Sequence, residues 1–270
     1  MPELPEVEIV CRNLSKMIEP GSRIRRWKFF RPDLRFVIPQ AELKKLVDRP
    51  LIRIERRAKY ILFRFKDHIL ISHLGMTGAW RREKDGWGIR KHDHLAFYIG
   101  SDVFVFEDPR RFGFIETIKA EELEMRFHNL GVEPLDKINH EALFSAFKVL
   151  KAPIKTALMN QKLLVGVGNI YASEVLFRTG VNPLKSCSKL SYDTYKLIFT
   201  EVKLVLSQAI EAGGSTISDY RNSYGEKGSY QNHFFVYGRK NEACVKCLTL
   251  IKSVFQAGRS TFWCPKCQKK

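Results

Sequence analysis

Met1-Pro2-Glu3-Leu4-Pro5-Glu6-Val7-Glu8 opens the chain and combines the start of a helix with an unusual set of reactive groups. Proline is favoured in the first turn of a helix, so Pro5 suits that place. Apolar residues then recur at helical spacing up to Pro20-Gly21: Val7, Val10, Cys11, Leu14, Met17 and Ile18. The stretch therefore predicts an amphipathic helix whose positive end lies beside Pro2.

Pro2 is a candidate nucleophile. Methionine is normally removed before proline, and this would leave a secondary amine at Pro2. The pKa of an α-amine is about 8, so a useful fraction is unprotonated at neutral pH, unlike a lysine. Attack of such an amine on C1′ of a sugar forms a permanently charged iminium, and this electron sink allows the 3′-phosphate to be eliminated. One nucleophile could then serve both base removal and strand cleavage.

Glu3 and Glu6 place two carboxylates within reach of the same sugar. One could protonate the ring oxygen as the sugar opens, and the other could hold the amine or relay a proton. Carboxylates at a helix N-terminus also complement the helix dipole. That simpler interpretation is as good as the catalytic one for Glu6 and weaker for Glu3.

The charge of the chain predicts a polyanionic partner. Lys and Arg number 46 against 29 Asp and Glu, which gives +17, and the excess runs along the whole chain. No apolar run is long enough for a membrane span, and the acidic first twenty residues are unlike a signal peptide. We therefore expect a cytoplasmic protein that binds nucleic acid and not a membrane.

The chain divides into a β-rich part and a helical part. Short apolar runs with turn residues between them fill Arg23 to Glu116 and predict an antiparallel sandwich or barrel. Helical patterns follow Leu130 to Pro134. We expect helices over 141–150 and 153–160, one capped by Asn169, and a long one from Ser191 to Gly213. Ser218 to His233 lacks periodicity and predicts a mobile loop.

Four cysteines predict a metal site near the end of the chain. Cys244-x2-Cys247 and Cys264-x2-Cys267 form two knuckles, which in a chain without a secretion signal indicate zinc before disulfides. Four thiolates complete a tetrahedral shell and leave no position for water. We therefore expect one Zn²⁺ with a structural role. Cys11 and Cys187 lie outside this pattern, and we expect them to be packed and inert.

Seven motifs together resemble the formamidopyrimidine-DNA glycosylase family, in its order and essentially from end to end. They are Met1 to Glu8, Arg56-Arg57-Ala58-Lys59-Tyr60, His73-Leu74-Gly75-Met76, Lys91-His92-Asp93-His94, Asp108-Pro109-Arg110-Arg111-Phe112-Gly113, Gly166 to Glu174, and Val236-Tyr237-Gly238-Arg239. The lead to the first knuckle departs from the family pattern, since Asn241 and Ala243 stand where Gly and Pro are common. Asn tolerates the left-handed conformation that Gly would supply.

The resemblance implies roles for residues of the β-rich part. It places Lys59 at a phosphate beside the lesion, and His73 and His92 at the DNA. Met76 would fill the gap left by an everted base, and Phe112 would wedge into the base stack. Arg110 would hydrogen-bond the orphaned base. Taken singly, Lys59 could be a solvated strand residue and Met76 and Phe112 could be packing residues. A structural hydrogen bond is nearly as good an interpretation of His73 as a DNA contact, and it is the better interpretation of His92 and His94.

The resemblance also implies a helix-two-turn-helix motif around Val165-Gly166-Val167-Gly168-Asn169. Its glycines and helix N-terminus would approach a phosphate closely, with Asn169 and Lys155 as side-chain contacts. A nucleotide-binding loop is a weak competitor, because neither a dinucleotide fingerprint nor a Walker lysine is present. Arg259 lies between the knuckles and matches the arginine that grips phosphates around the flipped nucleotide.

These observations predict an α+β multidomain protein. The expected domains are an N-terminal antiparallel β-sandwich with the N-terminal helix (1–133), a helical domain with the two-turn motif and a lesion-capping loop (134–235), and a four-cysteine zinc finger (236–270). DNA would lie between the domains. Pro2, Glu3, Lys59 and Arg259 would be catalytic, with Glu6 supporting them.

The resemblance implies a bacterial DNA glycosylase and abasic-site lyase of base-excision repair. It would act as a cytoplasmic, nucleoid-associated monomer on duplex DNA with oxidised purines or abasic sites, preferring cytosine opposite the lesion. One alternative is an endonuclease VIII-like glycosylase for oxidised pyrimidines; Leu4 and the 108–113 block favour the purine branch. The other is a non-catalytic zinc-ribbon protein, which leaves Pro2 and Glu3 unexplained.

Overall fold

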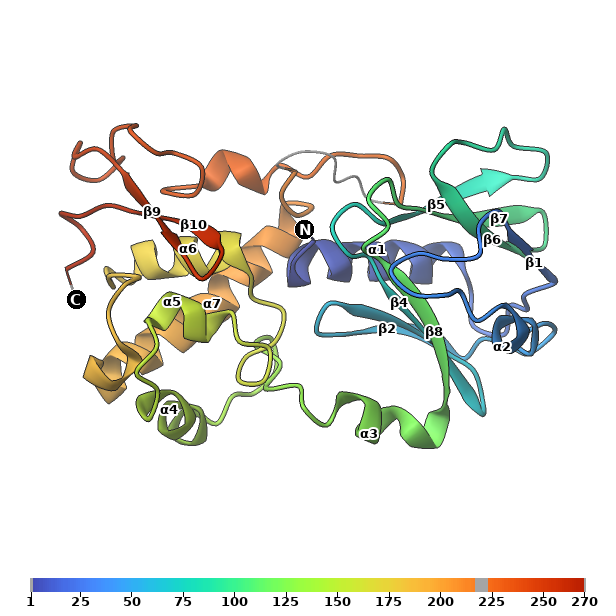
Figure 1. Cartoon of the computed structure of the whole chain (residues 1–270), viewed down its shortest axis with the longest axis horizontal. Coiled ribbons are helices and arrows are strands. Elements are labelled where there is room, and N and C mark those ends of the chain that lie inside the picture. The colour runs from blue at the N-terminus through green and yellow to red at the C-terminus, as the bar shows by residue number, and fades with distance from the viewer. Residues whose placement is uncertain (1, 217–222, 270) are drawn as a thin grey trace. The chain divides into compact units, whose positions relative to one another are not determined.

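The computed structural model describes residues 2–216 and 223–269, which form two compact units. The first unit comprises Met1–His128 and Ala212–Ser229, and the second comprises Asn129–Glu211 and Tyr230–Lys270. Figure 1 shows the chain and labels most of its helices and strands. No helix within the described ranges is long and apolar enough to cross a membrane.

The first unit is built on two four-stranded antiparallel sheets, as predicted. One sheet has the order β1-β6-β7-β5 and the other β2-β3-β4-β8. The strands are β1 (Arg26–Phe29), β2 (Arg53–Arg57), β3 (Tyr60–Arg64), β4 (His68–His73), β5 (Ala79–Lys84), β6 (Asp93–Ile99), β7 (Asp102–Glu107) and β8 (Phe114–Lys119). The helices are α1 (Leu4–Met17), α2 (Gln40–Lys44), the 3-10 turn Ala120–Glu122 and α3 (Leu123–Phe127).

The inner faces of the two sheets share one apolar core. Phe63 and Leu70 come from one sheet, and Trp80, Phe97 and Phe106 come from the other. Helix α1 adds its predicted apolar face to the same core through Val7, Val10 and Leu14. This shared core explains why strands far apart in the sequence form a single sandwich around the start of the chain.

The sequence did not single out β5, whose residues Ala-Trp-Arg-Arg-Glu-Lys are mostly charged. Trp80 is fully buried, whereas the neighbouring Arg81 pairs at 2.7 Å with Glu107 on the adjoining β7 and at 2.7 Å with Asp93 on β6, the strand beyond it. The charges that hide this strand from a hydrophobicity pattern are therefore satisfied across the sheet.

The second unit holds the predicted helices and the finger. Its elements are α4 (His140–Lys148), α5 (Ile154–Leu158), α6 (Asn169–Arg178), the 3-10 turn Cys187–Lys189, α7 (Tyr192–Glu211), the 3-10 turn Tyr230–His233, β9 (Lys252–Gln256) and β10 (Arg259–Trp263). Gly168 is the N-cap of α6, so the expectation that Asn169 caps this helix is wrong. The side chain of Asn169 contacts β10 instead.

The loop expected over Ser218 to His233 is only partly within the described residues, because 218–222 lie outside them. Its last four residues form a 3-10 turn and not a loop. Tyr230 is buried there, and its hydroxyl accepts a hydrogen bond from Arg178 Nη2 at 3.1 Å. Asn241 has φ of 65°, so it adopts the left-handed conformation expected where glycine is common.

Candidate active site

The N-terminus of α1 is a buried, hydrogen-bonded array. Pro2, Glu3 and Glu6 are all buried, and Glu3 and Glu6 form a capping box at the start of the helix. Glu6 Oε2 accepts the N–H of Glu3 at 2.8 Å. Glu6 Oε1 accepts both the N–H of Ser215 at 2.8 Å and its hydroxyl at 3.0 Å. Glu6 therefore ties the segment that follows α7 to the first turn of α1.

Close packing of Gly214 supports this tie. Gly214 has φ of +78°, and an added Cβ would lie 3.2 Å from Glu6 Oε1. Sequence reasoning missed Ser215, because a serine in a polar loop carries no signal of a partner 209 residues away.

Lys59 directly precedes β3, whose first residue, Tyr60, pairs with His73 at the end of β4. Lys59 is buried in the two-residue turn between β2 and β3, where Ala58 has φ of 53°. Burial, together with the positive charge of Lys59, lowers the pKa of His73 to about 4. His73 is therefore neutral at pH 7. Its Nδ1 accepts the N–H of Gly75 at 3.0 Å, which leaves the proton on Nε2, where it can be donated to an anion.

The residues predicted to form the wedge lie on two neighbouring turns. Met76 is partly buried in the turn between β4 and β5, and Phe112 is 43% exposed in the turn between β7 and β8. The guanidinium of Arg110 stacks over the Phe112 ring, 4.9 Å from its centroid. His92 is partly buried just before β6. An exposed aromatic side chain beside an arginine can both intercalate and read a base edge.

Lys155 and Asn169 converge on the finger hairpin of the second unit. Lys155 is 2% exposed, and its Nζ donates to Asn169 Oδ1 at 2.5 Å, to the Ser260 carbonyl at 3.1 Å and to Thr261 Oγ1 at 2.8 Å. Asn169 Nδ2 donates to the same Ser260 carbonyl at 3.1 Å. Both side chains thus hold β10, which begins at Arg259.

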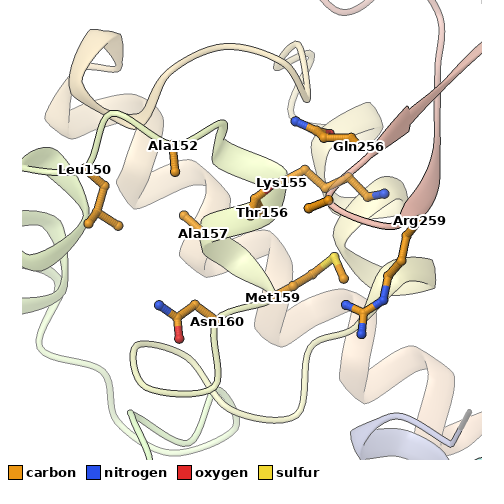
Figure 2. A pocket seen from close by; sticks show the side chains of 10 residues that line it. Leu150, Ala152, Lys155, Thr156, Ala157, Met159, Asn160, Gln256 and Arg259 are labelled. Atoms are coloured by element: carbon orange, nitrogen blue, oxygen red, sulfur yellow. The ribbon is translucent and has the colours of Figure 1, made fainter.

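Arg259 is exposed at the end of a tight hairpin. Ala257 and Gly258 form a two-residue connection with φ of 48° and 75°, which is the backbone of a type I′ turn. Arg259 also lines a cavity of about 360 Å³ between α5 and this hairpin (Figure 2). Lys155, Met159 and Asn160 line it from the α5 side.

The glycine-rich turn before α6 is organised by Gln161, which sequence reasoning did not identify. Its Oε1 accepts the N–H of Gly166 at 2.8 Å, and its Nε2 donates to the carbonyls of Met159 and Val167 at 3.0 and 3.1 Å. Gly166 has φ of 79°, so glycine suits the position.

Glu174 is a second residue with no predicted role. It is 1% exposed on α6, and its carboxylate accepts the backbone N–H groups of Phe235, Val236 and Tyr237 at 2.8, 3.0 and 2.8 Å. Burial raises the pKa of this carboxyl, and the three N–H groups oppose that effect because they favour the charged form. A run of apolar residues after a loop gives no hint of such an anchor.

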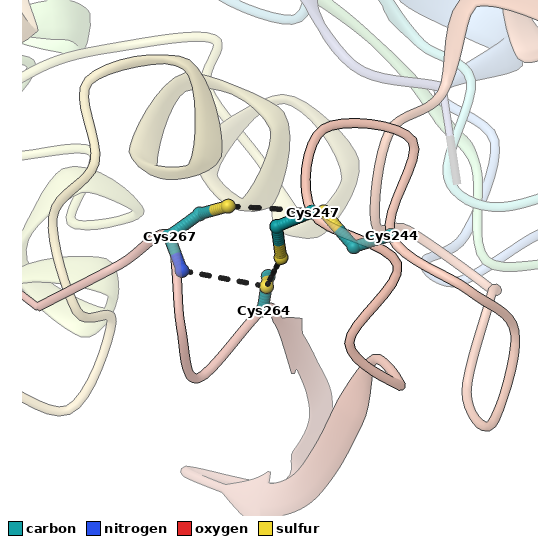
Figure 3. A group of neighbouring side chains, drawn as sticks. All are labelled: Cys244, Cys247, Cys264 and Cys267. Atoms are coloured by element: carbon teal, nitrogen blue, oxygen red, sulfur yellow. Dashed lines mark hydrogen bonds between the residues drawn. The ribbon is translucent and has the colours of Figure 1, made fainter.

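The four predicted zinc ligands come together in the second unit. Their sulfur atoms all lie within 4.8 Å of one another (Figure 3). Cys247 Sγ lies 3.4 Å from Cys264 Sγ, and Cys244 Sγ lies 3.8 Å from Cys267 Sγ. A tetrahedral zinc with Zn–S bonds of about 2.3 Å requires sulfur separations of about 3.8 Å, so the cluster fits the metal. Cys11 and Cys187 are buried elsewhere.

Family models match the chain in three consecutive segments. The formamidopyrimidine-DNA glycosylase N-terminal domain matches residues 1–115, the H2TH domain of the same enzyme matches 130–221, and a zinc finger found in this enzyme and in isoleucyl-tRNA synthetase matches 241–270.

The chain belongs to the formamidopyrimidine-DNA glycosylase family. A formamidopyrimidine-DNA glycosylase of Bdellovibrio bacteriovorus is 44% identical over the full length of both chains, and one of a Ruegeria species is 40% identical over both. A mutant of the Lactococcus lactis enzyme in complex with DNA containing Fapy-dG superimposes with a TM-score of 0.92 at 34% identity, covering both chains completely. The Lactococcus lactis enzyme with abasic-site DNA gives 0.91 at 33% identity, covering 99% of this chain and 100% of the other.

Membership of the formamidopyrimidine-DNA glycosylase family settles the class of activity. The protein is a DNA glycosylase of base-excision repair, and its family combines this activity with an abasic-site lyase. The four cysteines hold one structural zinc. The interpretation as a non-catalytic zinc-ribbon protein is thereby excluded.

Proposed function

We propose that this chain excises 8-oxoguanine and formamidopyrimidines from duplex DNA through the amine of Pro2. The observation that carries the proposal is the array at α1, where Pro2 lies directly before two buried carboxylates at a helix N-terminus. Bacterial relatives named for formamidopyrimidine lesions and neighbours solved with Fapy-dG or abasic-site DNA support the substrate class.

The chemistry follows from the secondary amine. After removal of Met1, the Pro2 nitrogen attacks C1′, the base leaves with the proton that the amine loses, and Glu3 protonates the ring oxygen as the sugar opens. The resulting iminium withdraws electrons, so loss of a C2′ proton expels the 3′-phosphate. A second elimination expels the 5′-phosphate, and water then releases the sugar remnant from Pro2. The path is thus β,δ-elimination.

We assign Glu6 a positioning role in place of the proton relay. Its two oxygens already accept three hydrogen bonds, from Glu3 and Ser215. It therefore orients the backbone of Glu3 and holds the Ser215 segment against the first turn of α1.

We further propose the following DNA contacts. Lys59, His73 through Nε2–H, and His92 bind phosphates near the lesion, and Arg259 grips phosphates from the finger. Lys155 and Asn169, expected from the sequence to bind phosphates themselves, support Arg259 by holding Ser260, which follows it in β10. Met76 and Phe112 fill the space of the everted base, and Arg110 reads the orphaned cytosine.

The domain limits 1–133, 134–235 and 236–270 remain a prediction. The family models match three segments in the same order along the chain. We propose that the enzyme acts as a monomer, because one chain carries Pro2, the wedge residues and the finger. We propose that it works in the bacterial cytoplasm, at the nucleoid, because chromosomal DNA would be its substrate.

Oxidised pyrimidines are the second candidate substrate. One solved structure of the Lactococcus lactis enzyme, with a TM-score of 0.90 and 34% identity, holds DNA with an oxidised pyrimidine. The same site could therefore accept thymine glycol.

Borohydride trapping tests both candidates. The protein is incubated with duplexes carrying 8-oxoguanine opposite cytosine or thymine glycol, and the covalent adducts are compared. We expect trapping on 8-oxoguanine to dominate, partial trapping by Pro2→Gly, and no trapping by a chain that retains Met1. Full trapping with Met1 demonstrably attached would rule out Pro2 as the nucleophile, and dominant trapping on thymine glycol would favour the second substrate.

A further inference from the structure

Asp108 lies where three segments with DNA-assigned residues meet. Segment 73–78 carries Met76, and segment 92–94 carries His92. The third segment, 108–113, carries Arg110 and Phe112. Asp108 is 0% exposed. It belongs to the first unit, as do all three segments.

The carboxylate of Asp108 joins two of the segments. Its Oδ1 accepts the hydroxyl of Thr77, and its Oδ2 accepts the N–H of Gly113 at 2.7 Å. The N–H of Arg110 is shared between Thr77 Oγ1 at 3.1 Å and Asp108 Oδ1 at 3.3 Å. Hydrogen bonds to a carboxylate are among the stronger ones in proteins, so this small network fixes both turns.

The backbone of Asp108 joins the third segment. Its N–H donates to the carbonyl of His92 at 3.1 Å. Its carbonyl accepts a hydrogen bond from His94 Nε2 at 2.8 Å, and burial lowers the pKa of His94, which keeps this imidazole neutral. The position of His92 is thus tied to the same residue.

Two glycines allow the turns to interlock. Gly75 has φ of +60°, and a Cβ there would lie 2.3 Å from the backbone nitrogen of Gly113. A Cβ on Gly113 would lie 2.8 Å from the carbonyl oxygen of His73. The turns therefore touch backbone to backbone, and a shift of one moves the other.

The partners of the Asp108 side chain all lie outside the strands. Strand β4 ends at His73 and β5 begins at Ala79, whereas β7 ends at Glu107 and β8 begins at Phe114. Thr77, Arg110 and Gly113 are all turn residues, so the hydrogen bonds of the Asp108 side chain act directly on the turns that carry the wedge.

We propose that Asp108, with Thr77, is a positioning residue that holds Met76, His92, Arg110 and Phe112 as one rigid unit for base eversion. The proposal rests on the proposed function for the roles of those four residues. A rigid unit lets the wedge residues and Arg110 enter the duplex together. The conformational entropy of these turns is then lost when the protein folds and not when the base is everted.

Thr77→Val tests the proposal with little risk to folding, because valine keeps the shape and removes the hydroxyl. Thr77→Ser is the matched control that keeps the hydroxyl. We expect Thr77→Val to slow single-turnover excision of 8-oxoguanine from duplex DNA about tenfold, the factor for about 1.4 kcal/mol of lost transition-state stabilisation. Cleavage of a single-stranded abasic oligonucleotide, which needs no eversion, should stay within about twofold of the parent. Thr77→Ser should behave as the parent on both substrates.

A double-mutant cycle separates positioning from general destabilisation. If Thr77 acts through Arg110, then adding Thr77→Val to Arg110→Ala should cost less than about twofold on the duplex substrate. Equal losses on duplex and single-stranded substrates, or fully multiplicative effects in the double variant, would overturn the proposal.

Hydrogen exchange of the free protein gives a readout that does not depend on activity. Thr77→Val and Asp108→Asn should speed amide exchange in the peptide 108–114 and leave strand β3 unchanged. Unchanged exchange in 108–114 for both variants would refute the network. If the two variants exchange faster in 108–114 but the parent traps no damaged substrate, the network stands and the proposed function is rejected.

Discussion

Glu174→Gln should loosen the segment that leads into the zinc finger. The carboxylate accepts two N–H groups on Oε1 and one on Oε2. An amide has only one acceptor oxygen. Even in its better orientation, with the oxygen facing Val236 and Tyr237, its NH2 group would face the N–H of Phe235. The variant therefore loses one charged hydrogen bond and leaves a partly buried donor unpaired.

The structure sets the size of this effect. Loss of one hydrogen bond to a charged group, with its donor left partly buried, costs about 2–3 kcal/mol. For a unit of this size we expect the melting temperature to fall by about 5–10 °C. Binding of duplex DNA should weaken as well, because the anchored segment precedes the finger that carries Arg259. Zinc content should remain at about one per chain, since the cysteine shell is untouched.

Thermal melting, zinc content and fluorescence anisotropy with a labelled duplex measure these three quantities. Glu201→Gln is the matched control, because Glu201 is a partly exposed glutamate that pairs with Arg178 at 3.2 Å. Such pairs contribute about 1 kcal/mol or less. If Glu174→Gln melts within about 1 °C of the parent and binds DNA equally well, Glu174 does not anchor the finger segment.

Three further predictions concern zinc, pH and DNA contacts. Cys247→Ser should release about one zinc per chain and abolish tight duplex binding; normal cleavage by the metal-free protein would contradict this. The pKa of His73 is lowered to about 4 in the folded state, so the unfolded chain binds the proton first and stability is lost as pH falls from about 6.5 to about 4. The free energy of unfolding, measured with urea at pH 7 and pH 4.5, should fall by about 2–3 kcal/mol less in His73→Gln than in the parent. If the two proteins lose the same free energy of unfolding over this range, His73 does not cause the pH dependence. Arg259→Ala should weaken damaged and undamaged duplexes alike and reduce the log–log salt slope by about one, whereas Arg110→Ala should reduce the preference for cytosine by about 1–3 kcal/mol. Cleavage of the lesion opposite each of the four bases, measured over a salt series, tests both variants. If Arg110→Ala loses only salt-dependent affinity and keeps the preference for cytosine, Arg110 does not read the orphaned base.

Local sequence patterns were enough to predict much of the fold. The apolar spacing after Pro5 predicted α1, the short runs over 23–116 predicted an antiparallel sandwich, and the two knuckles predicted the zinc cluster. Each of these depends on residues close in sequence, whose spacing alone determines which side chains share a face or a metal. The apolar pattern did not predict strand β5, because its charged residue Arg81 has its partners on other strands.

The sequence by itself determined the family, the nucleophile candidate and the zinc ligands, because short motifs hold those groups together. Only the tertiary structure decided what the buried polar groups do. Glu6 meets Ser215 across 209 residues, Lys155 meets Ser260 across 105, and Glu174 meets Phe235 across 61. A buried charge must find its hydrogen-bond partners wherever the fold brings them, and those partners leave no mark on the local pattern around it.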